Sequence, residues 1–459
     1  MKTVIVPVES TDRELDIRLL LCGSVGELLD ADARFFIGHS VSLRQLLLLM
    51  KNFVYFGKHV FGAPRFSDAA RVYDKIKKRN GVVIHLNEEG GIWPGQEKDW
   101  LGDLERAEKP SVMQSEDLLL EWGDYQTEFY KNFEPSSVSI ITSGHPRFDL
   151  NKEKYRWLLA NSIREIRQAH GDFILVNTTT SWGNNALGQE SHIFKETLNY
   201  NPNSVEDRIF RFKNWSHQKK VLAEVIKLVN EISLEYPDKK IIIRPHPAED
   251  VTIYKSVFCN IENIEVILVG SPGPWIAASE LFIHTGSSTA IEAHFLNVPT
   301  VYFRPHDSDM EILLASEVGK ICQSSKQVFE VIERPELGQV ARTSETSRSL
   351  LMNFDFDSIQ KTTELLVQKM NEVGSGRAVG RIAFKSFIVL HWFYLLLKRF
   401  YFSISGQSTR WHDFKQRFRP FDKKTISETL ALVGKQYGVK LELVKFSKYV
   451  LEVRVSKDG

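Results

Sequence analysis

Short apolar runs that alternate with amphipathic helical stretches are the feature of this sequence that most constrains its fold. In the N-terminal part such runs lie at residues 3–8, 34–39, 52–57, 82–87 and 138–144. A second series starts at 172–179 and continues at 239–247, 264–270, 280–288 and 299–305. Apolar runs of this length are typical of strands that are buried on both faces of a parallel sheet. The alternation therefore predicts an α/β fold with two doubly wound sheets.

The two series predict two Rossmann-like domains that face each other across a cleft. We expect the N-terminal domain at residues 1–165 and the C-terminal domain at residues 166–375, with a charged helical stretch at 151–171 between the two series. Residues 376–459 are expected to form a C-terminal helical and amphipathic extension, which includes an apolar, basic-flanked helix at 381–402. In a pair of such domains, nucleotides bind at the C-terminal ends of the strands.

The helix expected at 381–402 has two interpretations. Lys385, His391, Lys398 and Arg399 interrupt it, so its uninterrupted apolar core is too short to span a bilayer. Basic and aromatic side chains of this kind suit a helix that lies in the membrane interface. The alternative is a buried helix that packs across the two domains.

The composition excludes several classes of protein. The chain has 459 residues and a formal net charge of +1, so the overall balance does not indicate nucleic acid as a partner. Its three cysteines, Cys22, Cys259 and Cys322, lack the spacing of a zinc site or a disulfide framework, which fits a reducing cytoplasm.

The motif at residues 244–247 is the first candidate ligand site. An apolar strand ends at Arg244, and the prolines at 245 and 247 cannot continue a strand ladder. His246 is therefore presented at the edge of the sheet, where an imidazole or a guanidinium can donate hydrogen bonds to a phosphate. The alternative is that His246 only bonds a loop carbonyl.

The motif at residues 284–292 is the second candidate. An apolar strand ends in a Gly- and hydroxyl-rich turn that leads into a helix, which is the pattern of an anion site at a helix N-terminus. The candidate donor-binding residues are Thr285, Gly286, Ser287, Ser288, Thr289 and Glu292. Ser288 or Thr289 could instead be only an N-cap, with Glu292 completing a capping box. Asn177 and Thr178 follow another strand and are further candidates, with a hydroxyl-rich turn as the alternative.

Carboxylates follow the strands of the N-terminal half. Glu88 and Glu89 end the run at 82–87, and either could serve as a general base for an acceptor hydroxyl or be a solvated loop charge. His145, Arg147 and Asp149 follow the run at 138–144 and could line the cleft, with a turn stabilised by Asp149 as the alternative. Arg13, Glu14 and Asp16 are candidates for acceptor binding or for a helix-surface pair.

Motifs for other ligands are absent from the sequence. No DxD pair follows a strand to hold a divalent metal, and neither dinucleotide-binding nor P-loop glycine motifs occur. We therefore expect no metal and no cofactor.

The sequence resembles known families at several of these places. RPHP (244–247) and GSSTAIEA (286–293) resemble the HP and S motifs of GT-B sialyltransferases and Kdo transferases, which bind the CMP of their donors. The same segments are similar to those of CDP-glycerol glycerophosphotransferases. A bacterial family of surface carbohydrate biosynthesis proteins is resembled in scattered blocks over roughly residues 1–420, at VIVPVESTDRELDIRLLL (4–21), HLNEEGG (85–91), SGHPRFDL (143–150) and QRFRPF (416–421).

The resemblance implies roles for individual residues. His246, Ser287 and Ser288 would contact the donor phosphate, and Glu292 would reach the ribose. Some retaining Kdo transferases are thought to use an enzyme aspartate as nucleophile, and Asp149 is the candidate here.

Together these observations predict a GT-B glycosyltransferase of surface carbohydrate biosynthesis, such as that of capsule or lipopolysaccharide. Its donor would be a nucleotide sugar, with a CMP-nonulosonate such as CMP-Kdo as a candidate, bound by the C-terminal domain. The N-terminal domain would bind a surface polysaccharide or lipid-linked glycan as acceptor. The expected location is the cytoplasm, with peripheral contact at the inner membrane. The alternatives are a CDP-glycerol-type glycerophosphotransferase, a UDP-N-acetylhexosamine 2-epimerase-like enzyme and a non-enzymatic assembly scaffold.

Overall fold

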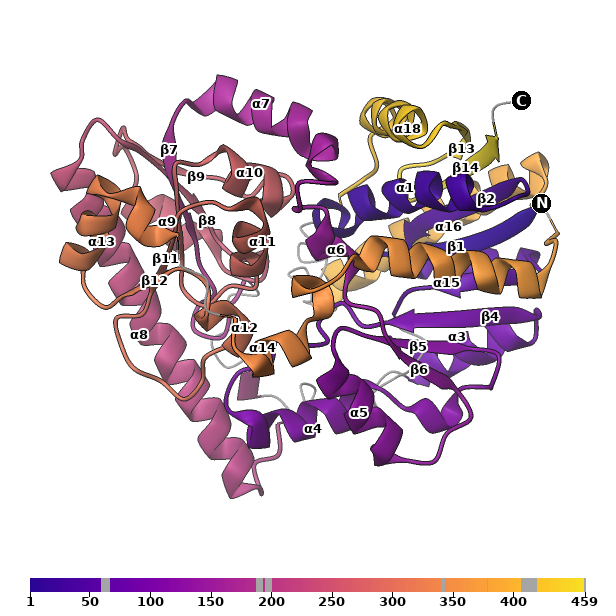
Figure 1. Cartoon of the computed structure of the whole chain (residues 1–459), viewed down its shortest axis with the longest axis horizontal. Helices are drawn as coiled ribbons and strands as arrows, with labels where there is room; N and C mark the ends of the chain where they lie inside the picture. The colour runs from indigo at the N-terminus through magenta and orange to yellow at the C-terminus, as the bar shows by residue number, and fades with distance from the viewer. Residues whose placement is uncertain are drawn as a thin grey trace. The chain divides into compact units, whose positions relative to one another are not determined.

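A computed structural model describes residues 1–58, 67–186, 193–194, 200–339, 343–377, 379–405 and 419–457. The chain divides into two compact units, each with its own sheet (Figure 1). Unit 1 comprises residues 1–91, 102–150 and 348–459, and unit 2 comprises residues 92–101 and 151–347. The first residues of the QRFRPF segment, 416–418, lie outside the described residues.

Unit 1 is built on eight strands in the order β13-β14-β2-β1-β3-β4-β5-β6. Its strands are β1 (Lys2–Val8), β2 (Ala33–His39), β3 (Phe53–Phe56), β4 (Gly81–Leu86), β5 (Leu118–Glu121), β6 (Ser139–Thr142), β13 (Val439–Phe446) and β14 (Val450–Lys457). β1 to β6 are parallel, whereas β14 runs antiparallel to both β2 and β13. The order β2-β1-β3-β4-β5 is that of a flavodoxin-like sheet, whose direction of winding changes between β1 and β3.

Helices cover both faces of this sheet. They are α1 (Thr11–Leu28), α2 (Ser40–Leu46), α3 (Ser67–Lys77), α5 (Asp124–Phe133), α6 (Pro146–Asp149), α15 (Ser358–Val373), α16 (Arg381–Ile404) and α18 (Lys423–Tyr437), with 3-10 turns η1 (Leu47–Leu49), η2 (Pro110–Val112) and η7 (Met352–Phe354). α4 (Glu97–Ala107) and α14 (Glu345–Leu350) have residues in both units. α15 contacts β1, β3 and β4 and also packs on α1 (Figure 1).

Unit 2 is built on six parallel strands in the order β12-β11-β10-β7-β8-β9. They are β7 (Phe173–Asn177), β8 (Lys240–Arg244), β9 (Ile264–Val266), β10 (Leu281–His284), β11 (Thr300–Phe303) and β12 (Lys320–Cys322). Counted from β7, this is the order 3-2-1-4-5-6 of a Rossmann fold read from the other edge, and the winding changes direction between β7 and β10. The α/β fold with two Rossmann-like domains is therefore confirmed.

Two apolar layers cover the sheet of unit 2. Its helices are α7 (Ala160–His170), α8 (Val205–Glu235), α9 (Val251–Val257), α10 (Pro272–Ala278), α11 (Thr289–Leu296), α12 (Leu313–Ser316) and α13 (Ser325–Glu333), with η3 (Arg156–Leu159) and η6 (Pro335–Gly338). Ile174 and Val176 of β7 face the layer that contains α8, α9 and α13, while Phe173 and Leu175 face α10 and α11. This alternation follows from the two-residue period of a strand.

The unit bounds differ from the expected domain bounds at the C-terminus. Residues 376–459 belong to unit 1, because β14 pairs with β2 along the register Leu451↔Ile37 and Val453↔Phe35. α18 also packs on α1. Pairing between strands some 400 residues apart leaves no local signal in the sequence, and the short strands β5 and β12 were not expected either.

Candidate functional site

The point in unit 2 where the winding changes direction brings the predicted donor motifs to one edge of the sheet. β7 lies between β10 and β8, and Asn177 at its end pairs with both His284 and Arg244. In open α/β sheets, ligands bind outside the carboxyl ends of the strands at such a point. The two motifs therefore follow strands that flank the same central strand.

The turn after β10 leaves open space beside a helix N-terminus. Gly286 has a φ of +94°, and a Cβ built on it would meet nothing closer than the Tyr302 side chain at 3.9 Å. Ser288 is the N-cap of α11 but makes no side-chain capping bond. Instead, the Ser287 hydroxyl accepts hydrogen bonds from the backbone N–H and hydroxyl of Thr289. The geometry thus retains a glycine turn and a helix start where an anion can approach.

The buried His284 side chain holds the turn after β10 in place. Its ring is buried, its Nδ1 accepts from the Gly286 N–H at 3.2 Å, and its Nε2 lies 3.0 Å from the Val318 carbonyl. Burial lowers the pKa of His284 to about 4, so the ring is neutral and positions the turn.

The turn after β7 joins the turn after β10 through hydrogen bonds. The Asn177 side-chain amide donates to the Thr289 hydroxyl at 3.2 Å, and the Thr179 N–H donates to the Thr285 hydroxyl at 3.1 Å. Two buried atoms of this turn, Asn177 Oδ1 and Thr179 Oγ1, have no hydrogen-bond partner among the described residues. Buried polar atoms without a partner are costly, so these two are candidates for ligand contacts.

Glu249 is a residue of this edge that the sequence did not single out. Its carboxylate is fully buried and accepts hydrogen bonds from Thr178, from Thr180 and from the Tyr254 hydroxyl. It therefore fixes the 177–180 turn, and Thr178 contacts Glu249 through its hydroxyl. A buried carboxylate needs several hydrogen-bond donors around it. Neither the burial of Glu249 nor these donors can be recognised in the sequence, so the sequence could not identify this residue.

Arg244 and His246, the two candidate residues of the RPHP motif, have different environments. The Arg244 guanidinium donates to the carbonyls of Val269 and Gly270 at 2.6 and 2.8 Å and lies over the Trp275 ring. It therefore holds the loop after β9. His246 is half-buried, and its Nδ1 accepts from the Ala248 N–H at 3.2 Å. In a neutral imidazole this leaves the proton on Nε2, which can then act as a donor.

Glu292 is buried on the first turns of α11, 4% exposed. A Cβ added to Gly273 of α10 would lie 3.6 Å from Glu292 Oε2. The carboxylate thus faces the start of α10.

A cavity of about 210 Å³ opens beside the glycine turn. Its polar and aromatic lining includes side chains from β11 and α8 and from the loops around them. These residues are Thr179, Ser181, Trp182, Asn214, His217, Gln218, Thr285, Gly286, Tyr302 and Glu311. The cavity continues from the predicted donor motif within unit 2 and is large enough for part of a nucleotide sugar.

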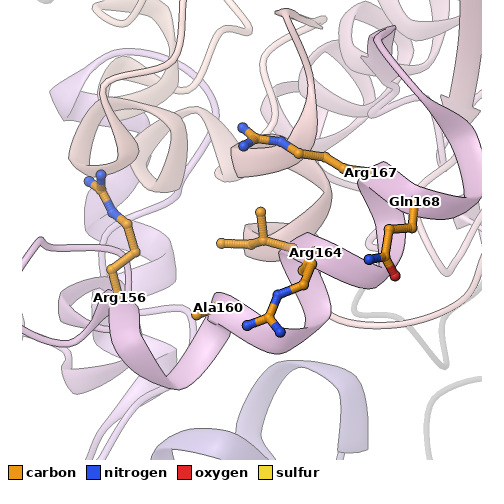
Figure 2. Close-up of a pocket in the computed structure, with 6 residues that line it drawn as sticks. Arg156, Ala160, Arg164, Arg167 and Gln168 are labelled. Atoms are coloured by element: carbon orange, nitrogen blue, oxygen red, sulfur yellow. The ribbon is translucent and has the colours of Figure 1, made fainter.

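A second hollow of about 540 Å³ lies along η3 and α7 and is lined by Arg156, Arg164 and Arg167 (Figure 2). Arg156 donates to the Phe295 carbonyl near the end of α11, and Arg167 donates to the Ala277 carbonyl near the end of α10. Cationic side chains commonly satisfy the last carbonyls of helices in this way. These two arginines are thus structural.

In unit 1, a cluster of charged side chains lies just beyond the carboxyl ends of β1, β4 and β6. Glu88 forms an ion pair with Arg18 at 2.5 Å and lies 3.1 Å from the His145 ring, whose pKa burial lowers to about 4, and Arg147 lies 3.8 Å from it. All four side chains are buried. Burial alone would raise the pKa of Glu88, but the facing His145 ring and the Arg18 guanidinium lower it well below its usual value. Glu88 is therefore ionised at neutral pH.

Glu14 adds a second carboxyl group to this cluster. It accepts from the backbone N–H groups of Glu9 and Ser10 at the start of α1. Burial and the nearby Glu88 carboxylate raise the pKa of Glu14 to about 7, despite the opposing charges of Lys58 and Arg18. A carboxyl group that titrates near neutrality can both accept and donate a proton. Arg13 and Asp16, its neighbours on α1, are half-buried.

Glu89 and Asp149 have environments that differ from that of Glu88. Glu89 is exposed, and its backbone N–H donates to the Asn87 side chain. Asp149 is fully buried and accepts from the Asn353 amide and from the backbone N–H of Ser358. Asp149 thus holds the start of α15, which does not leave its carboxylate open as a nucleophile.

No group of three or more His, Cys, Asp or Glu side chains within the described ranges is arranged to hold a metal ion. The buried polar atoms without a partner in the turn after β7 are one amide oxygen and one hydroxyl.

Comparisons with known proteins give structural similarity only. No protein-family model matches the chain, and no curated protein matches it. A UDP-GlcNAc 2-epimerase from Methanocaldococcus jannaschii, solved with UDP-GlcNAc and UDP, is 14% identical, with a TM-score of 0.48 over 80% of this chain and 100% of that chain.

S. aureus MnaA with UDP is 10% identical, with a TM-score of 0.47 over 82% of this chain and 98% of that chain. The wall teichoic acid polymerase TagF, with CDPG, is 12% identical, with a TM-score of 0.44 over 81% of this chain and 89% of that chain. At these scores, the fold assignment rests on the strand orders of the two sheets. None of these three is a CMP-Kdo or sialic acid transferase.

Proposed function

We propose that this chain is a glycosyltransferase that moves a sugar from a nucleotide-activated donor to a surface polysaccharide or a lipid-linked glycan. Unit 2 holds the donor, and the acid–base groups of unit 1 act on the acceptor. A CMP-nonulosonate such as CMP-Kdo is the candidate donor, since RPHP and GSST resemble the motifs that bind CMP in such enzymes.

One observation carries the proposal. At the edge of unit 2 where the winding reverses, an open glycine turn and a helix start lie beside two buried polar atoms without partners, Asn177 Oδ1 and Thr179 Oγ1. This is the place in an open α/β sheet where phosphate-bearing ligands bind.

The proposed chemistry uses the groups at this edge for the leaving nucleotide. As the bond between the sugar carbon and the phosphate oxygen breaks, negative charge builds up on the phosphate. The Nε2–H of His246 and the N-terminus of α11 stabilise that charge by hydrogen bonding and by the helix dipole. The acceptor oxygen forms the new bond to the sugar carbon, and its proton passes to a carboxylate.

Glu14 is the group in unit 1 best matched to take that proton. Its pKa of about 7 lies close to neutral pH, whereas the neighbouring His145 and Arg18 side chains hold the pKa of Glu88 low. A base works best when its pKa is near the working pH. Glu88 then positions the cluster, and Glu89 remains a candidate at its exposed place.

A thermal-shift panel of CMP, CDP, UDP, GDP and dTDP ligands tests the donor site. A nucleotide that binds the folded chain raises its melting temperature by mass action. His246→Ala should reduce this rise, because it removes the Nε2 donor. His170→Ala is the matched control, since His170 contacts Lys240 at the start of β8, at the opposite end of that strand.

The identity of the nucleotide that raises the melting temperature distinguishes the candidate functions. A rise with CMP ligands that depends on His246 supports the transferase with a nonulosonate donor, and a rise with UDP ligands points to hexosyl transfer or epimerisation. No response to any nucleotide would refute the donor site and favour an assembly scaffold. With CDP-glycerol as donor, a product that retains phosphate would identify a glycerophosphotransferase.

An epimerase-like reaction is the second candidate, and the carboxyl pair of unit 1 favours it. The Glu88 carboxylate is one of the causes that raise the pKa of Glu14, so the two carboxyl groups form an interacting pair of the kind that proton abstraction requires. Incubation with a nucleotide sugar in deuterated water, without acceptor, distinguishes the two reactions. Deuterium in the sugar ring supports epimerisation, whereas release of nucleotide only when acceptor is added supports transfer.

A further inference from the structure

The outward side of α16 carries a continuous set of exposed apolar and aromatic side chains. We call it the outer face, and it consists of Ile382, Val389, Leu390, Trp392, Phe393, Leu396, Leu397, Phe400, Tyr401 and Ile404. Leu390 and Leu397 are each 68% exposed, and Phe400 is 65% exposed. Soluble monomers rarely expose so many large apolar side chains on one element, so a surface of this kind marks an interaction site.

The opposite side of α16 fixes the helix on unit 1. Phe384, Phe387, His391 and Leu395 are buried and recur at helical spacing. The two phenylalanines belong to the apolar core that also contains Met50 and Val450, and His391 Nε2 lies 2.7 Å from the Ser42 hydroxyl. This inner side extends over three turns of the helix.

α16 is long enough to cross a membrane but is packed in a way that opposes it. Among the described residues it is the one helix whose length and composition would allow it to cross a membrane. Its most apolar 18-residue window has a mean hydropathy of 1.3, and 11% of that window is buried. Crossing a bilayer would require α16 to leave the core at Phe384 and Phe387 and to separate His391 from Ser42. A helix that keeps these contacts can only lie along a membrane.

The charges of α16 are all of one sign. Arg381, Lys385, Lys398 and Arg399 are its only charged residues, and no Asp or Glu lies between 381 and 404. Arg381 and Lys385 lie near one end and the other two lie toward the opposite end. Packing of α16 against α16 of a second copy would therefore bring cations together without any carboxylate to pair them. Anionic lipid headgroups provide the missing charge.

We propose that the outer face of α16 docks unit 1 on the surface of an anionic lipid bilayer. The helix lies in the plane of the interface, with its apolar and aromatic side chains among the acyl chains and its exposed basic side chains, Arg381, Lys385 and Arg399, at the headgroups. The pairing of exposed aromatic residues with flanking cations is the composition of an interfacial helix. This docking is independent of the nucleotide site in unit 2.

Co-sedimentation of the full chain with vesicles tests the proposal. Wild type should pellet with phosphatidylcholine vesicles that contain phosphatidylglycerol, and much less with pure phosphatidylcholine. Leu390→Glu with Leu397→Glu should weaken this binding at least about tenfold, because two large apolar side chains no longer enter the interface. The matched control is Ile209→Glu with Leu234→Glu, two exposed apolar residues of α8 in unit 2.

A second pair of variants tests the electrostatic part. Lys385→Gln with Arg399→Gln should remove most of the preference for phosphatidylglycerol and reduce the dependence of binding on salt. The thermal-shift response to nucleotides should not change in any α16 variant.

Four outcomes would overturn the proposal. The first is that the wild-type protein stays in the supernatant with both vesicle types. The second is that the α8 control variant loses as much binding as the α16 variant. The third is a chain that resists alkaline carbonate extraction as an integral protein does. The fourth is a dimer, detected by light scattering, that the α16 substitutions dissociate while no vesicle binding is seen.

Discussion

Replacing Asp149 by alanine should destabilise unit 1 strongly and locally. The carboxylate is fully buried, and it accepts hydrogen bonds from the Asn353 amide at 2.7 Å, from the Ser358 N–H at 2.5 Å and from the Ile359 N–H at 3.4 Å. The two backbone donors lie at the start of α15, which packs on β1, β3 and β4. Loss of the carboxylate removes the acceptor of the two backbone donors and one of the acceptors of the Asn353 amide, which also donates to the His145 carbonyl and the Ser358 hydroxyl.

The magnitude follows from these contacts. A hydrogen bond to a charged group contributes about 1.5–3 kcal/mol, and the two short bonds dominate because the third is long. We therefore expect Asp149→Ala to lower the free energy of unfolding by about 3–5 kcal/mol. Asp357→Ala is the control on the same helix. Asp357 is the half-buried N-cap of α15 and accepts from the Gln360 N–H, so its loss should cost about 1 kcal/mol.

Urea unfolding followed by circular dichroism measures the difference between the two variants. Amide hydrogen exchange over Ser358–Val373 shows whether the loss is local, since protection of α15 should fall first in Asp149→Ala. If Asp149→Ala is as stable as wild type but inactive, the structural role is refuted and the role of nucleophile regains support. If Asp149→Ala lowered the free energy of unfolding only as much as Asp357→Ala, the reasoning would also be contradicted. The buried hydrogen bonds of Asp149 would then contribute no more than the N-cap does.

Two further predictions concern the candidate sites. The folded-state pKa of Glu14 is raised from 4.5 to about 7, so its contribution to stability is full at low pH and is lost as pH rises through that window. Glu14→Gln should therefore become more stable relative to wild type by up to about 3 kcal/mol between these pH values, and parallel stability curves would contradict the pKa. Gly286→Ala should abolish the nucleotide-induced thermal shift, because a Cβ enters the open turn, while the φ of +94° costs about 1–2 kcal/mol without ligand. An intact shift would exclude close approach of the ligand to residue 286.

The sequence by itself determined most of the strands and the turns that carry the candidate donor residues. Apolar runs, prolines and glycines act over a few residues, so the strands that end at Asn177, Arg244 and His284 could be located within a few positions. The Gly286 turn is recognisable for the same reason, since only glycine readily adopts its backbone conformation.

Only the tertiary structure decided which of these ends meet and which side chains are occupied. β7 lies between β10 and β8, and β14 joins β2, because strand pairing acts between residues that are far apart in the chain. Asp149 looked like a cleft residue, but its partner Asn353 lies 204 residues away. Glu14, 70 or more residues from Glu88, likewise gained its raised pKa from burial and from a neighbour that no local pattern shows. Burial and long-range contacts set the state of each charge, and these are properties of the folded chain.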